Sequence, residues 1–162
     1  MNLIKTTLLV IAVLCFIEFA HSQDLRPLNE DSLKTVFKDN NDKIVVVNLW
    51  AFWCAPCKEE FPELVQFGKE NEKDAKLVFI SLDTKKDLEG KTKPFLKSNN
   101  VDFASYYNDF DKDEKLINML DENWEGAIPS TFYFKNGKLV KSLIGKQTLE
   151  TFEKTLKDVQ SN

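Results

Sequence analysis

Residues 44–57 read Ile-Val-Val-Val-Asn-Leu-Trp-Ala-Phe-Trp-Cys-Ala-Pro-Cys. The first seven of them form an almost continuous apolar, β-branched run, which is typical of a strand buried on both faces. Apolar residues at helical spacing follow from residue 61 to residue 65, so we expect a helix that starts at the cysteines and ends near Asn71. Cys54 and Cys57 therefore lie where a buried strand meets the N-terminus of a helix.

The rest of the chain predicts further strands and helices on both sides of this unit, after an extended lead-in at residues 24–30. Asn136-Gly137, between two apolar runs, is a strong signal for a two-residue hairpin turn. The order of elements predicts an α/β fold, a sandwich with a mixed central sheet flanked by helices. Early strands should be parallel, with right-handed crossovers, and the last two antiparallel. The expected helices are 31–39, around 94–97, 116–124 and 149–159, and the expected strands are 77–82, within 101–107, 131–135 and 138–144.

The first 22 residues differ in character from the rest. Lys5 precedes an apolar stretch, residues 8–20, that only Glu18 interrupts, and small residues stand three and one positions before Gln23. This pattern predicts a signal peptide over residues 1–22 that is cleaved before Gln23. An uncleaved membrane anchor is the alternative, although the apolar stretch is shorter than the roughly 20 residues that a spanning helix needs.

Cleavage at this position would leave a chain with few options for catalysis. His21 is the only histidine and Cys15 the third cysteine, so the mature chain would keep two cysteines and no histidine. That composition excludes Ser-His-Asp and Cys-His nucleophile systems, and two thiolates alone do not complete a tetrahedral zinc site. We therefore expect neither a metal nor another cofactor. A formal net charge of -4 and a pI near 5.1 argue against nucleic acid as a partner.

The placement of the two cysteines favours redox chemistry over a purely structural disulfide. A helix N-terminus offers partial positive charge and free N–H groups, which lower the pKa of a thiol at that position. Cys54 is thus the candidate for the attacking thiolate, and Cys57, one turn later and more buried, for the thiol that resolves the mixed disulfide. Pro56 suits the first turn of a helix and stiffens the loop between them.

The segment Trp50–Lys58 resembles the active-site signature of thioredoxin-like proteins. Pro62 matches the proline within the active-site helix of that fold, and residues 124–131 resemble the segment that carries its cis-proline. The resemblance implies that Pro129 is this cis-proline and lies against the cysteines. It also implies that the backbone of Ile128, just before it, pairs with the substrate chain.

Further features are similar to the exported TlpA/ResA-like branch of this family rather than to thioredoxin itself. Asn48 stands where thioredoxin carries a buried Asp, and the segment 82–119 is longer than the plain fold requires. In ResA-like proteins a Glu just before Phe-Pro tunes the thiols, and Glu60 matches it here. The resemblance implies one thioredoxin-like domain over residues 23–162 and a catalytic role for Glu60.

Alternatives stay open for several residues around the cysteines. Glu60 follows Cys57 by three residues, a spacing that places both side chains on one helical face, where a carboxylate can take the proton of Cys57. A solvated carboxylate in a charged run is the other interpretation. Asn48 offers either a catalytic contact or a buried hydrogen bond. Trp53 and Pro56 are candidates for substrate contact, with packing as the alternative for the tryptophan.

The dipeptide between the cysteines bears on the direction of electron flow. It contains no histidine donor of the kind that stabilises a strongly oxidising thiolate, so we expect a dithiol reductase, nearer to about −270 mV than to about −120 mV. The resemblance implies export to the periplasm or another extracytoplasmic site, with tethering by the N-terminus as a variant. It also implies protein thiol or disulfide substrates such as apocytochrome c, and a membrane electron donor. We expect a monomer.

Two further functions use the same fold or the same thiols. A thiol peroxidase would need a single activated cysteine in a Thr-x-x-Cys setting and an arginine beside it, whereas the one arginine, Arg26, is far upstream. A non-enzymatic Cu(I)-binding module or thiol chaperone would employ both thiolates, because Cu(I) prefers soft ligands. Peroxide turnover and metal stoichiometry discriminate between these functions.

Overall fold

The computed structural model describes residues 24–161, and the predicted signal peptide at residues 1–22 lies outside them. Six strands form a mixed sheet in the order β1-β4-β3-β2-β5-β6. The first four strands of the sheet, β1, β4, β3 and β2, are parallel to one another. Strand β5 runs antiparallel to both of its neighbours, β2 and β6. The predicted α/β sandwich with a mixed sheet is confirmed. The strands are β1 (Leu25–Leu28), β2 (Ile44–Trp50), β3 (Ala75–Ser81), β4 (Ser105–Asn108), β5 (Ser130–Lys135) and β6 (Lys138–Ile144).

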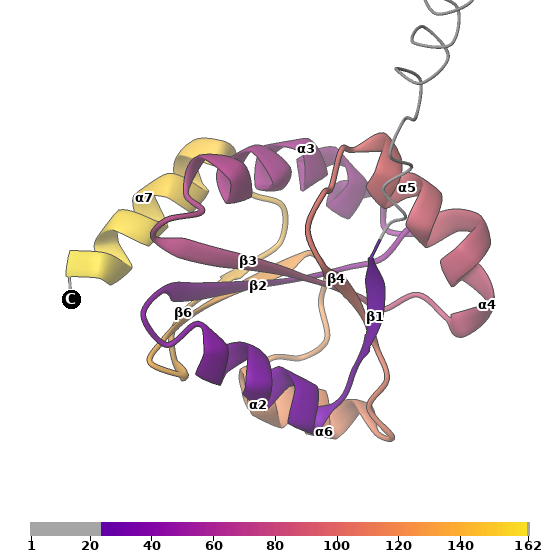
Figure 1. Cartoon of the computed structure of the whole chain (residues 1–162), viewed down its shortest axis with the longest axis horizontal. Coiled ribbons are helices and arrows are strands. Elements are labelled where there is room, and N and C mark those ends of the chain that lie inside the picture. The colour runs from indigo at the N-terminus through magenta and orange to yellow at the C-terminus, as the bar shows by residue number, and fades with distance from the viewer. Residues whose placement is uncertain (1–23, 162) are drawn as a thin grey trace, which may run out of the picture.

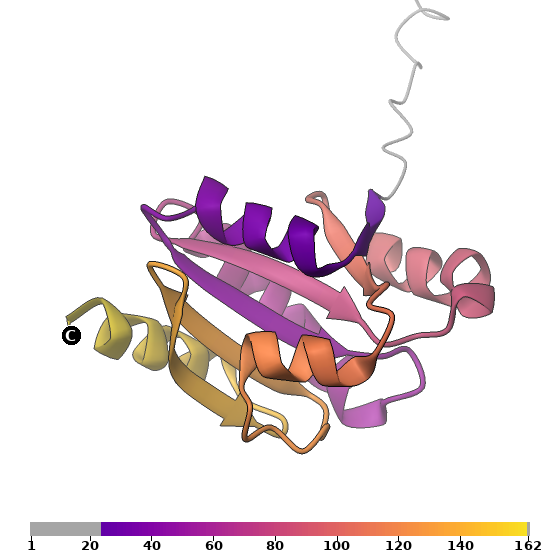
Figure 2. The same ribbon diagram turned by 90° about the horizontal axis from the view of Figure 1, so that it is seen from below.

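Helices cover both faces of the sheet. In Figure 1, α3, α5 and α7 lie above the sheet, and α2 and α6 lie below it. Figure 2, seen from below, places α2 and α6 in front of the strands. The helices are α2 (Glu30–Asp39), α3 (Ala55–Glu70), α4 (Lys85–Asp87), the π-helical turn η1 (Leu88–Thr92), α5 (Lys93–Ser98), α6 (Asp113–Leu120) and α7 (Leu149–Ser161).

The central strand β2 divides the core into two parts. Its apolar even-numbered residues belong to the cluster under α3 and α7, and its odd-numbered residues from 45 to 49 belong to the cluster under α2 and α6. This alternation follows from the pleat of a strand, whose successive side chains point to opposite faces. Asn48 is therefore a fully buried polar residue on the same face of the sheet as α3.

The hairpin between β5 and β6 forms at the predicted turn. Asn136 has a φ of 53° and Gly137 a φ of 72°. Two consecutive positive φ values are what a type I′ turn requires, and its twist matches that of the flanking strands. The turn therefore sets the register in which Lys135 lies opposite Lys138.

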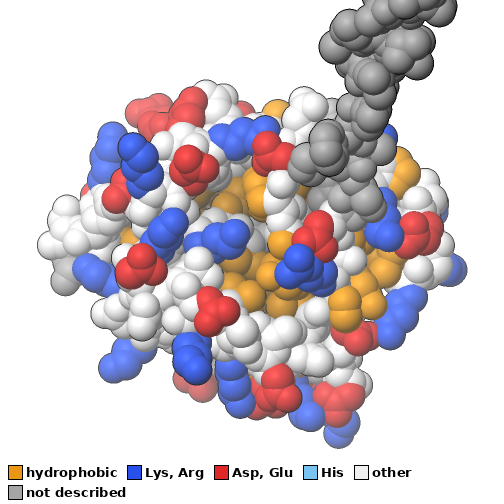
Figure 3. All heavy atoms as spheres, in the orientation of Figure 1, with side chains coloured by type: hydrophobic (Ala, Val, Ile, Leu, Met, Phe, Trp, Pro, Cys, Tyr) orange, Lys and Arg blue, Asp and Glu red, His pale blue; other side chains and the backbone are white. Residues whose placement is uncertain are grey.

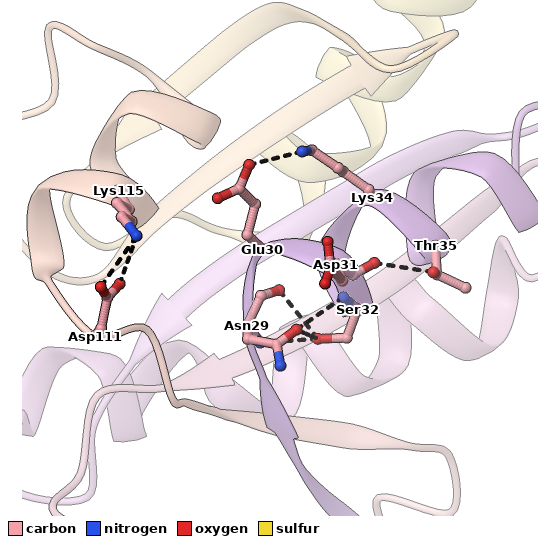
Figure 4. A network of polar contacts seen from close by, with 8 residues as sticks. All are labelled: Asn29, Glu30, Asp31, Ser32, Lys34, Thr35, Asp111 and Lys115. Atoms are coloured by element: carbon pink, nitrogen blue, oxygen red, sulfur yellow. Dashed lines mark hydrogen bonds and ion pairs between the residues drawn. The ribbon is translucent and has the colours of Figure 1, made fainter.

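A reciprocal cap fixes the start of α2, as Figure 4 shows. The side-chain oxygen of Asn29 accepts a hydrogen bond from the N–H of Ser32 at 3.0 Å, and the Ser32 hydroxyl accepts one from the N–H of Asn29 at 2.8 Å. Each bond satisfies a backbone N–H that the helix itself leaves unpaired. An ion pair between Glu30 and Lys34, one turn apart, adds to the exposed face of the same turn.

Two boundaries differ from the sequence predictions. The expected lead-in contains the edge strand β1, which pairs in parallel with β4. The predicted helix through Trp124 is wrong at its end, because α6 stops at Leu120. Trp124 lies in the following loop, where its indole N–H donates to the carbonyl of Ala127 at 2.9 Å and to the hydroxyl of Ser130 at 3.1 Å. These contacts tie the tryptophan to the loop before β5 instead of to the helix.

Charges of both signs share the surface. Figure 3 shows Lys and Arg side chains interspersed with Asp and Glu side chains over the face seen in Figure 1, with hydrophobic side chains visible between them. Such mixing is typical of a soluble domain surface. Among residues 24–161, no helix combines the length and the apolar character needed to cross a membrane.

Candidate active site

The two cysteines form a disulfide at the N-terminus of α3. Cys54 is the N-cap of the helix, and its sulfur accepts a hydrogen bond from the N–H of Cys57 at 3.2 Å. Pro56 occupies the first turn, where its missing N–H leaves no helical carbonyl unpaired. The helix N-terminus thus directs N–H groups and partial positive charge at the Cys54 sulfur, as the strand-to-helix pattern predicted.

The two cysteines are both buried. Cys54 is 5% exposed and Cys57 is 1% exposed. The neighbouring residues project outward, since Trp53 is 67% exposed and Pro56 is exposed as well. The indole of Trp53 is thus a large exposed apolar surface next to Cys54 in the sequence.

The segment expected to bind substrate lies beside the disulfide. The peptide bond between Ile128 and Pro129 is cis. The Cys54 sulfur is 3.8 Å from the carbonyl oxygen of Ile128, which is half-buried. The hydroxyl of Ser130 donates to the carbonyl of Ala127 at 2.6 Å and so holds this loop in place. The structure thus places the Ile128 carbonyl, next to Pro129 in the chain, beside the Cys54 sulfur, although the two residues are 74 positions apart in the sequence.

Glu60 is buried in the first half of α3, one turn after Cys57, and is only 1% exposed. One carboxylate oxygen accepts a hydrogen bond from the Asn48 amide at 3.2 Å, and the other accepts one from the backbone N–H of Gln147 at 2.8 Å. The Asn48 amide also donates to the hydroxyl of Thr131 at 3.0 Å. Glu60 is therefore not a solvated carboxylate, and Asn48 makes buried hydrogen bonds.

Burial raises the pKa of Glu60 to about 7, because the ionised form loses its hydration. The hydrogen bonds from the backbone of Gln147 and the amide of Asn48 oppose this rise, since they favour the charged form. Nearby Glu63 raises the pKa further, and Lys146 lowers it. A carboxyl group poised near neutral pH can accept and return a proton with little cost in either direction.

Three carboxylates of α3 hold the loop between β6 and α7. The pairs are the Glu59 carboxylate with the Lys146 ammonium at 2.7 Å, Glu60 with the N–H of Gln147, and Glu63 with the N–H of Leu149. The same loop reaches the cis-proline segment, because the N–H of Gly145 donates to the carbonyl of Pro129 at 2.8 Å. Gly145 has a φ of 82°, a conformation that favours glycine. This loop thus connects Glu60 with the backbone next to Cys54.

Sequence reasoning missed Asp83, which is 5% exposed and lies two residues after the end of β3. Its carboxylate accepts hydrogen bonds from the N–H of Phe52 and from the hydroxyls of Ser81 and Thr92. Asp83 opens a charged stretch in which no spacing marks one carboxylate as buried. The available signal is its position shortly after a buried strand, where the chain turns beside the active-site loop.

Comparison with protein families matches residues 18–142 to the family described as AhpC/TSA. The chain belongs to the AhpC/TSA family. The thiol-disulfide oxidoreductase ResA of Bacillus cereus (strain ZK / E33L) is 31% identical over 128 residues, which cover 78% of this chain and 69% of that protein. The sporulation thiol-disulfide oxidoreductase A of Bacillus subtilis is 26% identical over 113 residues, which cover 68% of this chain and 65% of that protein.

Solved structures share the fold of this AhpC/TSA family member. StoA from Bacillus subtilis superimposes with a TM-score of 0.54 at 24% identity, covering 70% of this chain and 81% of its own. A DsbF homologue from Corynebacterium diphtheriae gives a TM-score of 0.62 at 23% identity, with 75% of each chain covered. The fold is thioredoxin-like. Together with the curated relatives and the paired cysteines, these findings make the chain a thiol–disulfide oxidoreductase of the ResA/StoA type.

The arginine and threonine that a thiol peroxidase needs do not stand beside Cys54 in this AhpC/TSA family member. Arg26, the only arginine, forms an exposed ion pair with Asp24 at the edge strand β1. Three residues before Cys54, where a thiol peroxidase would carry threonine, the chain has Ala51. Within residues 24–161, no cluster of three or more His, Cys, Asp or Glu side chains is arranged to hold a metal ion.

Proposed function

We propose that the protein is a dithiol reductase of exported protein disulfides, in which Cys54 attacks and Cys57 resolves. The observation that carries this proposal is the cysteine pair at the N-terminus of α3, with the Cys54 sulfur as N-cap and the Ile128 carbonyl beside it. The Cys54 sulfur is the one that accepts a hydrogen bond from a backbone N–H of the helix, that of Cys57. Its thiolate is therefore the one that the fold stabilises.

The reaction transfers two electrons and two protons. The Cys54 thiolate attacks one sulfur of the substrate disulfide, and the other substrate sulfur leaves as a thiolate that takes up a proton. Cys57 then loses its proton and attacks the Cys54 sulfur. This step forms the internal disulfide seen in the structure and releases the second substrate thiol.

Glu60 is proposed as the group that receives the proton of Cys57. Both side chains belong to α3, are buried, and are three residues apart, which places them on one helical face. A pKa of about 7 lets the carboxyl group accept the proton and later release it at neutral pH.

Substrate binding is assigned to Trp53, Pro56, Ile128 and Pro129. Trp53 supplies a large exposed apolar surface beside the disulfide, and the half-buried Ile128 presents its carbonyl to the same place. An extended substrate segment would add main-chain hydrogen bonds to this backbone, as peptides do at strand edges. Main-chain recognition suits an enzyme that reduces more than one protein sequence.

The cellular setting follows from the same proposal. Residues 1–22 act as a signal peptide or remain as an anchor, the domain spans residues 23–162, and the protein works outside the cytoplasm as a monomer. One structural neighbour is described as a secreted disulfide oxidoreductase and another as an exposed lipoprotein thioredoxin, which supports this location. Protein thiols, among them apocytochrome c, would be substrates. Cytosolic reductants do not reach that compartment, so a membrane protein would supply the electrons.

The experiment that tests the direction is the equilibrium potential of the Cys54–Cys57 pair, measured against glutathione and thioredoxin buffers. We expect a value below about −220 mV, as for a thiol reductant, whereas a value above about −150 mV would show an oxidant. Cys57→Ser is the control, because it cannot close the internal disulfide and should instead accumulate a mixed disulfide at Cys54.

A further inference from the structure

The active-site loop between β2 and α3, residues 51–54, is held in place by a few hydrogen bonds. Residues 51–54 turn tightly, with the N–H of Cys54 donating to the carbonyl of Ala51 at 3.1 Å. The N–H of Phe52 points out of this turn to the carboxylate of Asp83, 3.0 Å from one oxygen and 3.1 Å from the other. Asp83 lies on the side of β3, whereas the Ile128 carbonyl approaches Cys54 from the loop before β5.

Asp83 is itself held firmly. Its carboxylate also accepts hydrogen bonds from the Ser81 hydroxyl and the Thr92 hydroxyl, each at 2.8 Å. Ser81 ends β3, and Thr92 ends the π-helical turn η1, so the carboxylate joins three separate segments. Both hydroxyl residues are fully buried. These donors come from three directions along the chain and together fix the orientation of the carboxylate.

The ring of Phe52 adds a second link on the same side. It lies edge-on to Phe95 of α5, with centroids 6.0 Å apart, and the Lys58 ammonium lies 4.9 Å above it. A shift of the Phe52 backbone would therefore move the position of the Lys58 charge, one residue after Cys57, as well as the N-cap itself.

We propose that Asp83 is a positioning residue, which holds the N–H of Phe52 and thereby places the Cys54 sulfur for attack on the substrate disulfide. It acts through the backbone of the active-site loop and touches no reacting atom. The inference rests on the attacking role of Cys54 proposed above. Losing the anchor would leave the loop free to turn, so that the sulfur spends less time at the end of the helix and facing substrate.

The test compares variants that keep or remove the acceptor for Phe52. In Asp83→Asn the amide oxygen still accepts from Phe52, and the amide N–H groups donate to the two hydroxyls, which can rotate to accept. In Asp83→Ala the acceptor is gone. Asp83→Ser keeps a polar group that can bond with Ser81 and Thr92, but its side chain is too short to reach the N–H of Phe52. This variant replaces Asp83→Ala in the test if the alanine variant does not fold.

Two quantities are measured on the reduced proteins well below their unfolding temperature: the rate of Cys54 alkylation by iodoacetamide against pH, and the rate of reduction of a peptide disulfide. We expect Asp83→Ala and Asp83→Ser to reduce the disulfide about tenfold more slowly and to show a higher Cys54 thiol pKa. Asp83→Asn should stay within about threefold of the wild type. Thr155→Val is the matched control, since it removes a buried hydroxyl from α7, outside the hydrogen bonds of Asp83, and should lower stability alone.

Rates and Cys54 thiol pKa values of Asp83→Ala and Asp83→Ser equal to those of the wild type would overturn the inference. So would an Asp83→Asn variant as slow as the alanine variant, because the charge and not the position would then matter. Alkylation of Cys57 in place of Cys54 in the wild type would instead overturn the proposed order of the cysteines, and the inference with it.

Discussion

Glu60 combines two opposing properties at the scale of a single residue. It is buried like a core residue, yet both of its oxygens have hydrogen-bond donors. The Asn48 side-chain oxygen has no partner among the described atoms, and rotating the amide would let that oxygen accept the O–H of a protonated Glu60. The pocket therefore accommodates both protonation states of the carboxyl group, which a proton acceptor requires.

This burial predicts a pH dependence of stability. Glu60 keeps its proton up to about pH 7 in the folded protein but only to about pH 4.5 in the unfolded chain. As the pH rises through that window the unfolded chain binds fewer protons than the folded one, so the free energy of unfolding falls, by at most about 1.4 kcal/mol per pH unit. Above about pH 7 this contribution is flat. Denaturant titrations of the oxidised protein at pH 4.5 to 8 measure it.

Glu60→Gln should abolish this fall, because glutamine is neutral throughout the window. Glu59→Gln is the matched control, since the neighbouring Glu59 is exposed, pairs with Lys146 and has a lowered pKa. The control should keep the slope of the wild type. An unchanged slope in Glu60→Gln would mean that Glu60 is already ionised in the folded protein across this range.

Helix α3 shows how tightly one element must pack to carry the site. Gly68, near its end, leaves no room for a side chain, because a Cβ at this position would lie 2.7 Å from Cδ2 and 3.2 Å from Cβ of Leu77 on β3. Leu77 is buried, so it has little freedom to move aside. The close approach of helix and strand therefore depends on this glycine.

Gly68→Ala should destabilise the protein by up to about 2 kcal/mol, because overpacking costs about 1–3 kcal/mol and alanine regains only roughly 1 kcal/mol over glycine inside a helix. Gly90→Ala is the control, since a Cβ there meets no atom within 4 Å. It should be neutral or slightly stabilising. Urea unfolding midpoints compare the two, and a neutral Gly68→Ala would show that Leu77 repacks freely.

At the scale of the whole molecule, the direction of electron flow is linked to stability. A disulfide that is harder to reduce in the folded protein than in the unfolded chain stabilises the fold. Each 30 mV of difference between the two reduction potentials adds about 1.4 kcal/mol to the free energy of unfolding. For a reductase we therefore expect the oxidised protein to unfold at a higher guanidinium concentration than the reduced protein. A strong oxidant shows the opposite order, because its reduced form is stabilised.

The measurement is a pair of guanidinium titrations, with and without a thiol reductant. The double variant Cys54→Ala/Cys57→Ala is the control, and its midpoint should not respond to the reductant. A reduced protein more stable than the oxidised one would contradict the reductase direction while leaving the redox activity intact.

The sequence was sufficient to predict those structural features that depend only on residues close together in the chain. The β-branched run of β2, the cysteines after it and the turn at Asn136-Gly137 are all specified by neighbouring residues, and each occurs as predicted. The position of the cis bond before Pro129 coincides with the residue that the family resemblance indicated.

Features that depend on distant partners were not predictable in the same way. Glu60 was a candidate from its motif, but its burial depends on Gln147, 87 positions later. The buried Asp83 accepts a hydrogen bond from Phe52, 31 positions earlier. Strand β1 exists because β4 lies alongside it. Local propensity carries no information on such encounters, which are set by tertiary packing.

The hydrogen bond between Glu60 and Gln147 has a consequence for biogenesis. Translation makes the chain from its N-terminus, so both cysteines leave the ribosome well before the residues that complete the pocket around the carboxyl group. The hydrogen-bonded setting of Glu60 can therefore form only after residue 147 has left the ribosome. Until then the nascent chain exposes both thiols to oxidants.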